Sequence, residues 1–179
     1  MKVIETDFEG LFIVEHRIFK DDRGVFVKTY NAEAFKHFNI NLEISERYFS
    51  VSKKNVIRGM HFQTPPKDHT KLVTVISGKI LDVVLDLRKG SNTFGKYFSK
   101  ELDNNNYKTI IIPKGFAHGF KAMENNTIVE YNQSTCYSLK NDDGIRFDSF
   151  GFDWKVVKPI VSKRDLSFHP FGEYKSPFE

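Results

Sequence analysis

The sequence predicts an all-β domain, built as an antiparallel sandwich or barrel. Short runs rich in β-branched and aromatic residues recur roughly every ten residues, with turn residues between them. Segments with a helical pattern are few and short. Many short strands at such spacing are typical of β-sandwiches and barrels, in which the interior or the mouth commonly holds a small-molecule pocket.

The predicted strands follow one another along most of the chain. They cover residues 11–14, 25–30, 56–62, 71–76, 79–87, 108–112 and 127–132. Turn residues separate several of them, at Asp-Asp-Arg-Gly (21–24), at Ser77-Gly78 and at Pro-Lys-Gly (113–115). The pair Ser77-Gly78 predicts a tight hairpin between the two strands that flank it.

Two segments lie outside the strand pattern. Residues 32–38 predict a short helix capped by Asn31, and residues 162–179 predict a loop with a short helix. No repeat or linker-like stretch divides the 179 residues. We therefore expect a single domain over residues 1–179.

Composition and charge indicate which binding partners and which cellular compartment to expect. The net charge of +4 is spread over separate lysines, without the block of like charges that marks a nucleic-acid-binding arm. No run approaches the roughly 18 apolar residues that a membrane span requires. Cys136 is the only cysteine, so no internal disulfide can form, and the N-terminus lacks a signal-peptide core. These features favour a reducing cytoplasm.

A histidine in the predicted strand 56–62 is the first candidate for chemistry. Alternation places His61 on the same face as Gly59 and Gln63. Arg58 is then expected on the opposite face. Because imidazole titrates near neutral pH, His61 could act as a general base on the inner face of a barrel. The alternative is a buried histidine bonded to a backbone carbonyl.

A second histidine follows a turn. His118 lies in Pro-Lys-Gly-Phe-Ala-His-Gly-Phe (113–120), which resembles the second motif of cupins, jelly-roll barrels with a double-stranded β-helix. Metal-binding cupins add a His-x-His pair and a glutamate. Here the first motif reads His61-Phe62-Gln63, so only two plausible ligands remain where transition metals need three or four. We expect no metal.

Three further residues become informative as a set. Lys71 opens a strand and could stabilise an enolate oxygen, Asp165 could orient a histidine, and Tyr131 could donate a proton. Each has an ordinary structural alternative when taken alone. Those alternatives are a surface lysine, a loop aspartate and a packing tyrosine.

The frame that holds these residues resembles a known family. Its motifs, in chain order, are Asp-Arg-Gly-Val-Phe (22–26), Lys-Lys-Asn-Val-Ile-Arg-Gly-Met-His-Phe-Gln (53–63), Lys-Leu-Val (71–73), Asp-Val-Val-Leu-Asp-Leu-Arg (82–88), Thr-Phe-Gly (93–95), Ile-Pro-Lys-Gly-Phe-Ala-His-Gly-Phe (112–120) and Ser-Lys-Arg-Asp (162–165). Together they resemble the dTDP-4-dehydrorhamnose 3,5-epimerase family of cupins, from about residue 8 to about residue 166. The resemblance implies a cupin jelly-roll barrel with a few short helices.

The resemblance also implies an activity and the residues that perform it. The activity is inversion of carbon 3, carbon 5 or both in a nucleotide-linked 4-keto-6-deoxy sugar, without a cofactor, in the synthesis of surface polysaccharide precursors such as those of capsule or lipopolysaccharide. His61 matches the base, paired with Asp165, and Tyr131 matches the acid on the opposite face. Lys71 matches the lysine near the enolate oxygen, and His118 a second histidine of the site.

The resemblance also implies which residues bind the substrate. Arg23 and Arg58 match arginines that contact the diphosphate, for which a guanidinium fork is well shaped. Tyr137 matches an aromatic that stacks near the nucleotide. Family members are homodimers, so a homodimer is expected here. The remaining substrate-binding candidates are Phe26, Lys28, Glu46, Tyr48 and Gln63.

The chain departs from the family where the nucleotide is expected. Glu46-Arg47-Tyr48 replaces a typical Gln-Asp-Asn, and Lys28 replaces a common glutamate. Guanine presents two adjacent donors that the carboxylate of Glu46 could accept, so this segment predicts GDP as the carrier in place of dTDP, with a heptose or a hexose. Asp142 and Cys136 replace a glutamate and a tyrosine at the sugar end, which leaves the inverted carbon open.

Three other functions remain as alternatives. A sugar-nucleotide 3,4-ketoisomerase also transfers protons without a metal, but the set of His61, Tyr131 and Asp165 favours the epimerase. A non-catalytic sugar-nucleotide-binding cupin would have lost the base and acid, which this chain retains. A metal-dependent cupin oxygenase would need the missing His-x-His pair.

Overall fold

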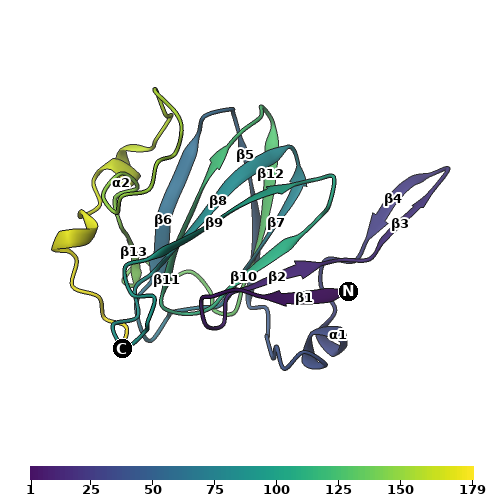
Figure 1. Ribbon diagram of the computed structural model, residues 1–179, viewed down its shortest axis with the longest axis horizontal. Coiled ribbons are helices and arrows are strands. Elements are labelled where there is room, and N and C mark those ends of the chain that lie inside the picture. Colours follow the sequence, from purple (N-terminus) through teal and green to yellow (C-terminus); the bar gives the residue numbers. More distant parts are fainter.

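The computed structural model describes all 179 residues and contains two antiparallel β-sheets that face each other (Figure 1). The strands of the first sheet, in spatial order, are β1 (Lys2–Glu5), β2 (Phe12–Glu15), β10 (Thr109–Ile112), β7 (Lys71–Ser77), β12 (Thr127–Gln133) and β5 (Glu46–Ser52). Those of the second sheet are β13 (Asp142–Gly144), β6 (Ile57–Gln63), β11 (Phe116–Ala122), β8 (Lys79–Asp86) and β9 (Tyr97–Asp103). From β5 onward the chain repeatedly crosses between the sheets, as in a jelly roll. The predicted all-β fold is confirmed.

Apolar side chains fill the space between the sheets and cover both outer faces. The inner cluster includes Val73 and Val129 of the first sheet with Val84 and Phe120 of the second, all fully or almost fully buried. A second cluster lies on the outer face of the second sheet, where residues 145–178 cover it. A third, around Phe35, covers the outer face of the first sheet. Each sheet is therefore buried on two faces over much of its area.

The short helices agree with the sequence. Helix α1 (Ala32–Lys36) is shorter than the predicted segment by two residues, and the side chain of Asn31 caps it by accepting from the Ala34 amide at 3.0 Å. Helix α2 (Lys163–Leu166) begins after Ser162, whose hydroxyl accepts from the Asp165 amide. One 3-10 turn, Phe171–Glu173, follows. No helix is long and apolar enough to cross a membrane.

The hairpin predicted at Ser77-Gly78 is wrong. Strands β7 and β8 do not pair, because β7 lies between β10 and β12 in one sheet and β8 lies between β11 and β9 in the other. Gly78 has φ +78°, and a Cβ there would lie 2.5 Å from the Thr127 hydroxyl oxygen. The glycine therefore lets the chain turn tightly against β12 and pass from one sheet into the other.

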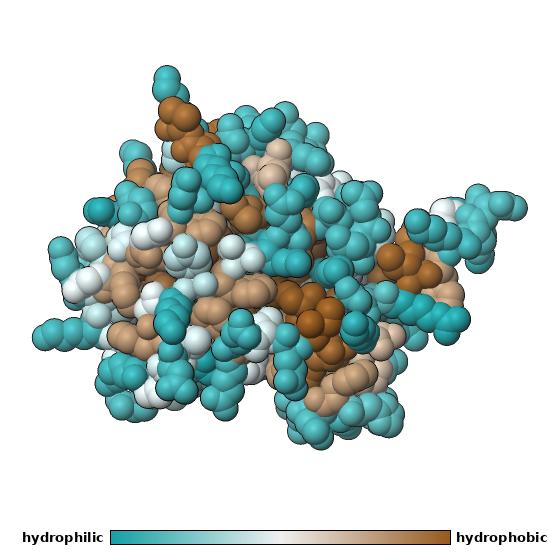
Figure 2. Space-filling view, in the orientation of Figure 1, coloured by the Kyte–Doolittle hydropathy of each residue, from teal (hydrophilic) through white to brown (hydrophobic).

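A separate hairpin extends away from the two sheets. Strands β3 (Ile18–Asp21) and β4 (Gly24–Val27) pair only with each other and project to one side in Figure 1. We call residues 18–27 the arm. Phe19 and Phe26 pack together on it at 6.1 Å between ring centroids, yet they are 46% and 62% exposed. Figure 2 shows hydrophobic residues at the surface of the projecting arm, among hydrophilic ones.

Candidate active site

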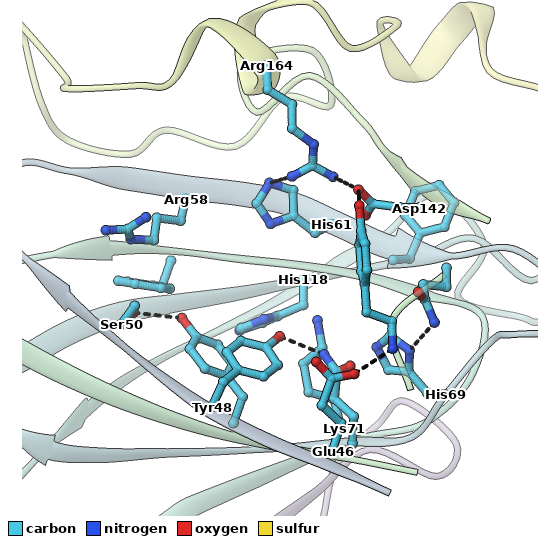
Figure 3. Close-up of a pocket in the computed structure, with 16 residues that line it drawn as sticks. Glu46, Tyr48, Ser50, Arg58, His61, His69, Lys71, His118, Asp142 and Arg164 are labelled. Atoms are coloured by element: carbon cyan, nitrogen blue, oxygen red, sulfur yellow. Dashed lines mark hydrogen bonds and ion pairs between the residues drawn. The ribbon is translucent and has the colours of Figure 1, made fainter. Parts of the chain in front are cut away.

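A cavity of about 540 Å³ opens between the two sheets at one end of the sandwich. This volume falls within the usual range for small-molecule sites. The lining comes from strands of both sheets and from two nearby loops. The lining residues are Glu46, Tyr48, Ser50, Arg58, His61, Phe62, Gln63, His69, Lys71, His118, Phe120, Tyr131, Gln133, Tyr137, Asp142 and Arg164 (Figure 3).

His61 and Asp165 form a hydrogen-bonded pair on the wall supplied by the second sheet. The His61 Nε2 lies 2.9 Å from the Asp165 Oδ1, and Asp165 Oδ2 accepts from the Gly59 amide at 3.1 Å. Burial raises the pKa of Asp165, but the bonds from His61, Gly59 and Ser162 outweigh it and the pKa is lowered. Because the ionised carboxylate only accepts, Nε2 carries the hydrogen, which leaves the lone pair of the imidazole on Nδ1.

Arg58 lines the same cavity as His61, so its predicted place on the opposite face is wrong. His118 pairs with His61 and Phe120 pairs with Arg58, so three steps along β6 correspond to two steps along β11. This extra residue is a β-bulge, which resets the alternation of side chains. Gly59, inside the bulge, approaches Gly119 so closely that a Cβ would lie 2.4 Å from the Gly119 Cα.

His118 is held by a buried carboxylate that the sequence did not single out. Its Nε2 lies 2.7 Å from the Asp82 Oδ2, and both side chains are almost completely buried. Burial lowers the pKa of His118, against the opposing effect of Asp82. The other oxygen of Asp82 has no hydrogen-bond partner in the protein. An aspartate inside the apolar run of β8 was the available signal, since buried carboxylates are rare unless paired.

Lys71 points into the cavity and is only 6% exposed, so it is not a surface lysine. Burial lowers the pKa of its ammonium from 10.5 to about 8, although Asp82 and Asp142 favour the charged form. A cation in so dry a place interacts strongly with negative charge that develops nearby. Lys71 is therefore suited to hold an enolate oxygen.

The wall supplied by the first sheet carries two tyrosines. Tyr131 of β12 is 6% exposed, and its hydroxyl lies 3.2 Å from the Ser50 hydroxyl. Burial raises the pKa of Tyr131, which keeps the phenol protonated. Tyr48 of β5 stacks on Tyr131 with ring centroids 4.7 Å apart. Tyr131 thus faces His61 from the opposite sheet, as the sequence predicted.

A network of polar contacts lies beside His61 at the mouth of the cavity. Arg164 donates to the Asp142 carboxylate at 2.6 Å and has its Nη1 3.4 Å from the His61 Nε2 (Figure 3). The Tyr137 hydroxyl donates to the same carboxylate oxygen at 3.3 Å. Glu46 accepts from the Tyr137 amide through its Oε2. Arg164 was not predicted from the sequence as a residue of the site, although it adjoins Asp165 in the motif 162–165.

Gln63 lines the cavity, but protein partners occupy its amide. Its Nε2 donates to the Lys67 carbonyl at 2.7 Å, and its Oε1 accepts from the Ser138 amide. It therefore ties the loop after β6 to the loop after β12. His69, which was not predicted from the sequence, belongs to the loop after β6, has its Nδ1 3.3 Å from the Gln63 Nε2 and lines the cavity. Burial and then Lys71 lower the pKa of His69 to about 3, so its ring is neutral.

Three predicted substrate-binding residues lie outside this cavity. Arg23, Phe26 and Lys28 belong to the arm or follow it, and none lines the cavity. The Arg23 guanidinium is 90% exposed and forms an ion pair with Asp21. Within one copy of the chain, these residues do not take part in the site.

The cavity therefore brings a base and an acid together on facing walls. His61, paired with Asp165, could serve as a base, Tyr131 on the facing wall could serve as an acid, and Lys71 lies in the same cavity. The structure contains no group of three or more His, Cys, Asp or Glu residues placed to hold a metal ion. This arrangement fits reversible removal and return of a proton at a carbon made acidic by a neighbouring carbonyl.

Comparison with known proteins points to one family. The family model of dTDP-4-dehydrorhamnose 3,5-epimerase matches residues 5–173. An epimerase of that name from Methanothermobacter thermautotrophicus is 37% identical over 177 residues, covering 96% of this chain and 95% of the relative. A Bacillus anthracis epimerase solved with TDP and pyrophosphate is 38% identical, with a TM-score of 0.92, covering 94% of this chain and 98% of that one.

A third relative was solved with a sugar nucleotide. This Legionella pneumophila epimerase, in complex with dTDP-4-keto-L-rhamnose, is 30% identical with a TM-score of 0.92, covering 97% of this chain and 94% of that one. The likeness extends over nearly the whole length of each of these proteins. The fold, the cavity and these matches agree that the chain belongs to the dTDP-4-dehydrorhamnose 3,5-epimerase family, whose members are isomerases that act on carbohydrates.

Proposed function

We propose that the protein inverts carbon 3, carbon 5 or both in a nucleotide-linked 4-keto-6-deoxy sugar, by proton transfer through an enolate. The observation that supports this most directly is the placement of His61 and Tyr131 on facing walls of one cavity. Inversion requires a proton to leave one face of a carbon and another to arrive on the opposite face. The ligand-bound relatives support a nucleotide sugar as the substrate.

The reaction follows from the positions of the side chains. His61 Nδ1 takes the proton beside the ketone, the C–H bond breaks, and the electron pair moves to the ketone oxygen. Asp165 stabilises the imidazolium that forms, and Lys71 stabilises the enolate oxygen. Tyr131 then gives its proton to the opposite face of the carbon as the ketone reforms. Water then takes the proton from the imidazolium and returns one to the phenolate, so the reaction consumes no other reactant.

The test is proton NMR in heavy water with a 4-keto-6-deoxy sugar carried by dTDP or by GDP. We expect deuterium to enter carbon 3, carbon 5 or both, together with signals of the epimer. The position of the deuterium gives the regiochemistry, and comparison of the two ligands gives the preferred carrier. A ligand that binds but shows neither exchange nor inversion at any carbon would contradict the proposal and favour a non-catalytic binding protein.

The nucleotide carrier is a finer proposal. The carboxylate of Glu46 supports GDP, because it is an acceptor for the adjacent donors of guanine. In the structure one carboxylate oxygen of Glu46 already accepts from the Tyr137 amide. That hydrogen bond must break before both oxygens of Glu46 can accept from guanine. The relatives are named for dTDP sugars. The proposed sugar is a heptose or a hexose, as predicted from the sequence.

Glu46→Gln tests the carrier. Loss of the carboxylate should weaken binding of a GDP sugar by about tenfold, the effect of one lost charge-assisted hydrogen bond, and leave binding of a dTDP sugar within about twofold. Isothermal titration calorimetry with both ligands measures this difference. An unchanged ratio of the two affinities would contradict the proposal that Glu46 reads guanine.

A homodimer is a further part of the proposal. An isolated two-stranded hairpin is at best marginally stable in water, yet the arm pairs only with itself and exposes Phe19, Val25 and Phe26. A second copy that covers the arm would bury these side chains. It would also allow Arg23, which does not line its own cavity, to reach the cavity of the other copy and contact a diphosphate there.

A further inference from the structure

The wall that carries the acid holds a second phenol in direct contact with the first. Tyr48 on β5 is the residue paired with Tyr131 on β12, so both side chains leave the sheet on the cavity side. Their rings stack with an interplanar angle of 19° and centroids 4.7 Å apart.

The two hydroxyls point toward opposite ends of the cavity. That of Tyr131 bonds to Ser50 at 3.2 Å, and that of Tyr48 bonds to Gln133 at 2.6 Å. Along the strands, Ser50 lies on one side of the tyrosine pair and Gln133 on the other. In Figure 3 the two dashed lines leave the stacked rings in opposite directions. The wall therefore offers donors at two separate places across from His61.

The hydrogen of the Tyr48 hydroxyl is not used within the protein. Gln133 Nε2 is the donor in their bond, so the phenol oxygen accepts and its own hydrogen stays free for a ligand. The same N–H would stabilise the phenolate left after the hydrogen is given away. Tyr48 is 40% exposed, whereas Tyr131 is 6% exposed, so Tyr48 has the easier route to water for a new proton.

We propose that Tyr48 is a second catalytic acid, which protonates one of the two carbons beside the ketone while Tyr131 protonates the other. This inference rests on the proposed function. His61 breaks a C–H bond and forms the enolate, the Tyr48 O–H bond then breaks, and a new C–H bond forms on the face opposite His61 as the ketone returns. Water reprotonates the phenolate, and the reaction needs no other reactant.

The separation of the Tyr48 and Tyr131 hydroxyls matches a substrate in which two carbons can be inverted. Carbons 3 and 5 lie on opposite sides of the ketone, so one fixed phenol would have to serve two positions and be reprotonated between them. Two phenols directed to opposite ends of the cavity allow the sugar to keep one orientation. The pair would make this protein an epimerase that acts at both carbons.

The experiment compares Tyr48→Phe, Tyr131→Phe and the double variant with the wild type. Each is incubated in heavy water with the nucleotide-linked 4-keto-6-deoxy sugar that the wild type accepts. NMR follows deuterium entry and inversion separately at carbon 3 and carbon 5. We expect Tyr48→Phe to lose about 100-fold in inversion at one carbon and to keep inversion at the other within about threefold. Tyr131→Phe should show the converse.

Deuterium entry separates an acid from a mere packing residue. In Tyr48→Phe, His61 still removes the proton and returns a deuteron to the same face, so exchange should persist at the carbon that no longer inverts. Tyr97→Phe is the matched control, because Tyr97 lies outside the cavity on β9 and packs against Phe152. It should leave both rates unchanged, and circular dichroism should show that all variants are folded.

Several results would overturn the inference. They are inversion of both carbons by Tyr48→Phe at wild-type rates, equal slowing at both carbons, and a wild type that inverts one carbon alone. A folded wild type that inverts neither carbon would instead overturn the proposed function, and this inference with it. The two failures are therefore distinguishable from the wild-type spectrum.

Discussion

The pair of His61 and Asp165 is the smallest unit on which the proposed reaction depends. The carboxylate of Asp165 fixes which nitrogen of His61 carries hydrogen, and it accepts from the Gly59 amide at the same time. The N-terminal turn of α2 holds the carboxylate in place through Ser162.

Replacement of either member should therefore abolish most of the activity. We expect His61→Asn and Asp165→Asn each to reduce kcat by about 10²- to 10⁴-fold, because the first removes the base and the second the charge that stabilises its protonated form. Initial rates of epimer formation measure this. Thermal unfolding of each variant is the control, and a kcat within twofold of the wild type would rule out the assigned role.

Lys71 gives the activity a distinct dependence on pH. With its pKa lowered to about 8 by burial, Lys71 is charged below that pH and neutral above it. Only the ammonium stabilises an enolate oxygen, so kcat/KM should fall as the pH rises through about 8. Rates measured from pH 6 to pH 10, with substrate far below KM, report this property of the free enzyme.

Two variants identify the group that titrates. Lys71→Met should lower kcat/KM by about 10²- to 10³-fold at pH 7, as loss of a charge at an oxyanion does. Lys71→Arg keeps the charge throughout the range, so the fall near pH 8 should vanish. Persistence of that fall in Lys71→Arg would assign it to another group.

The sequence predicted the central residues of the cavity better than their supports. His61, Lys71, His118 and Asp165 came from motifs and Tyr131 from the overall resemblance, and the structure places four of the five in the cavity lining and Asp165 behind His61. Their supports were missed because each needs a contact between distant segments. Such pairing depends on the register between strands, which alternation alone cannot fix. The missed supports are Asp82, His69 and Arg164.

The strands show where local pattern is sufficient and where it is not. Runs of β-branched residues predicted β7, β8, β10 and β12 within one or two residues. Strand β5 was missed because its sequence, Glu-Arg-Tyr-Phe-Ser-Val-Ser, mixes charged and polar residues with apolar ones at the edge of a sheet. Edge strands commonly carry such polar residues, which weakens the apolar alternation that marks a strand.

The bulge in β6 is the element that places Arg58 beside His61. Strict alternation would separate them, and the extra residue between the two pairs with β11 reverses that outcome. Gly59 makes the bulge possible, because it has φ +136° and lies against the backbone of Gly119. The sequence contained Gly59, but a glycine within a strand does not say on which side the following residues emerge.

Gly59→Ala should therefore destabilise the fold. A Cβ would meet the Gly119 backbone at 2.4 Å in a conformation that other residues rarely adopt. We expect a loss of about 3 kcal/mol or more in the free energy of unfolding, from strain together with displacement of β11. Denaturant unfolding followed by circular dichroism measures it.

The matched control for this change is Gly151→Ala. Gly151 also has a positive φ, +78°, but nothing lies within 4 Å of its added Cβ. Gly151→Ala should lower the free energy of unfolding by about 1 kcal/mol, the cost of placing an alanine at a positive φ. Equal losses in the two variants would mean that the close approach of β6 to β11 contributes nothing.

At the scale of the whole molecule, the arm and the cavity form one functional unit only if two copies associate. The arm carries Arg23 and Phe26, which the family motifs assign to substrate binding, yet neither lines the cavity of its own chain. The sequence predicted the roles of these residues through their motif. It could not predict their distance from His61, because a hairpin that extends away from the sheets has no signature in composition.

A complementation experiment decides whether the arm acts in the cavity of a second copy. His61→Asn has an intact arm and an inactive cavity, whereas Arg23→Ala has an intact cavity and an arm without its guanidinium. Each homodimer should be impaired, the second mainly through a KM raised about tenfold or more, the effect of one lost contact to phosphate. In a co-expressed heterodimer, the intact arm would meet the intact cavity.

We therefore expect the purified heterodimer to recover a wild-type KM with about half the wild-type kcat per dimer, because one cavity in two is complete. Lys20→Ala is the control partner for Arg23→Ala, since Lys20 lies on the arm but belongs to no motif of the family. If the arm served its own cavity, the only live cavity in the heterodimer would keep the altered arm, and its KM would stay raised. A protein that sediments as a monomer at assay concentrations while fully active would also exclude the shared site.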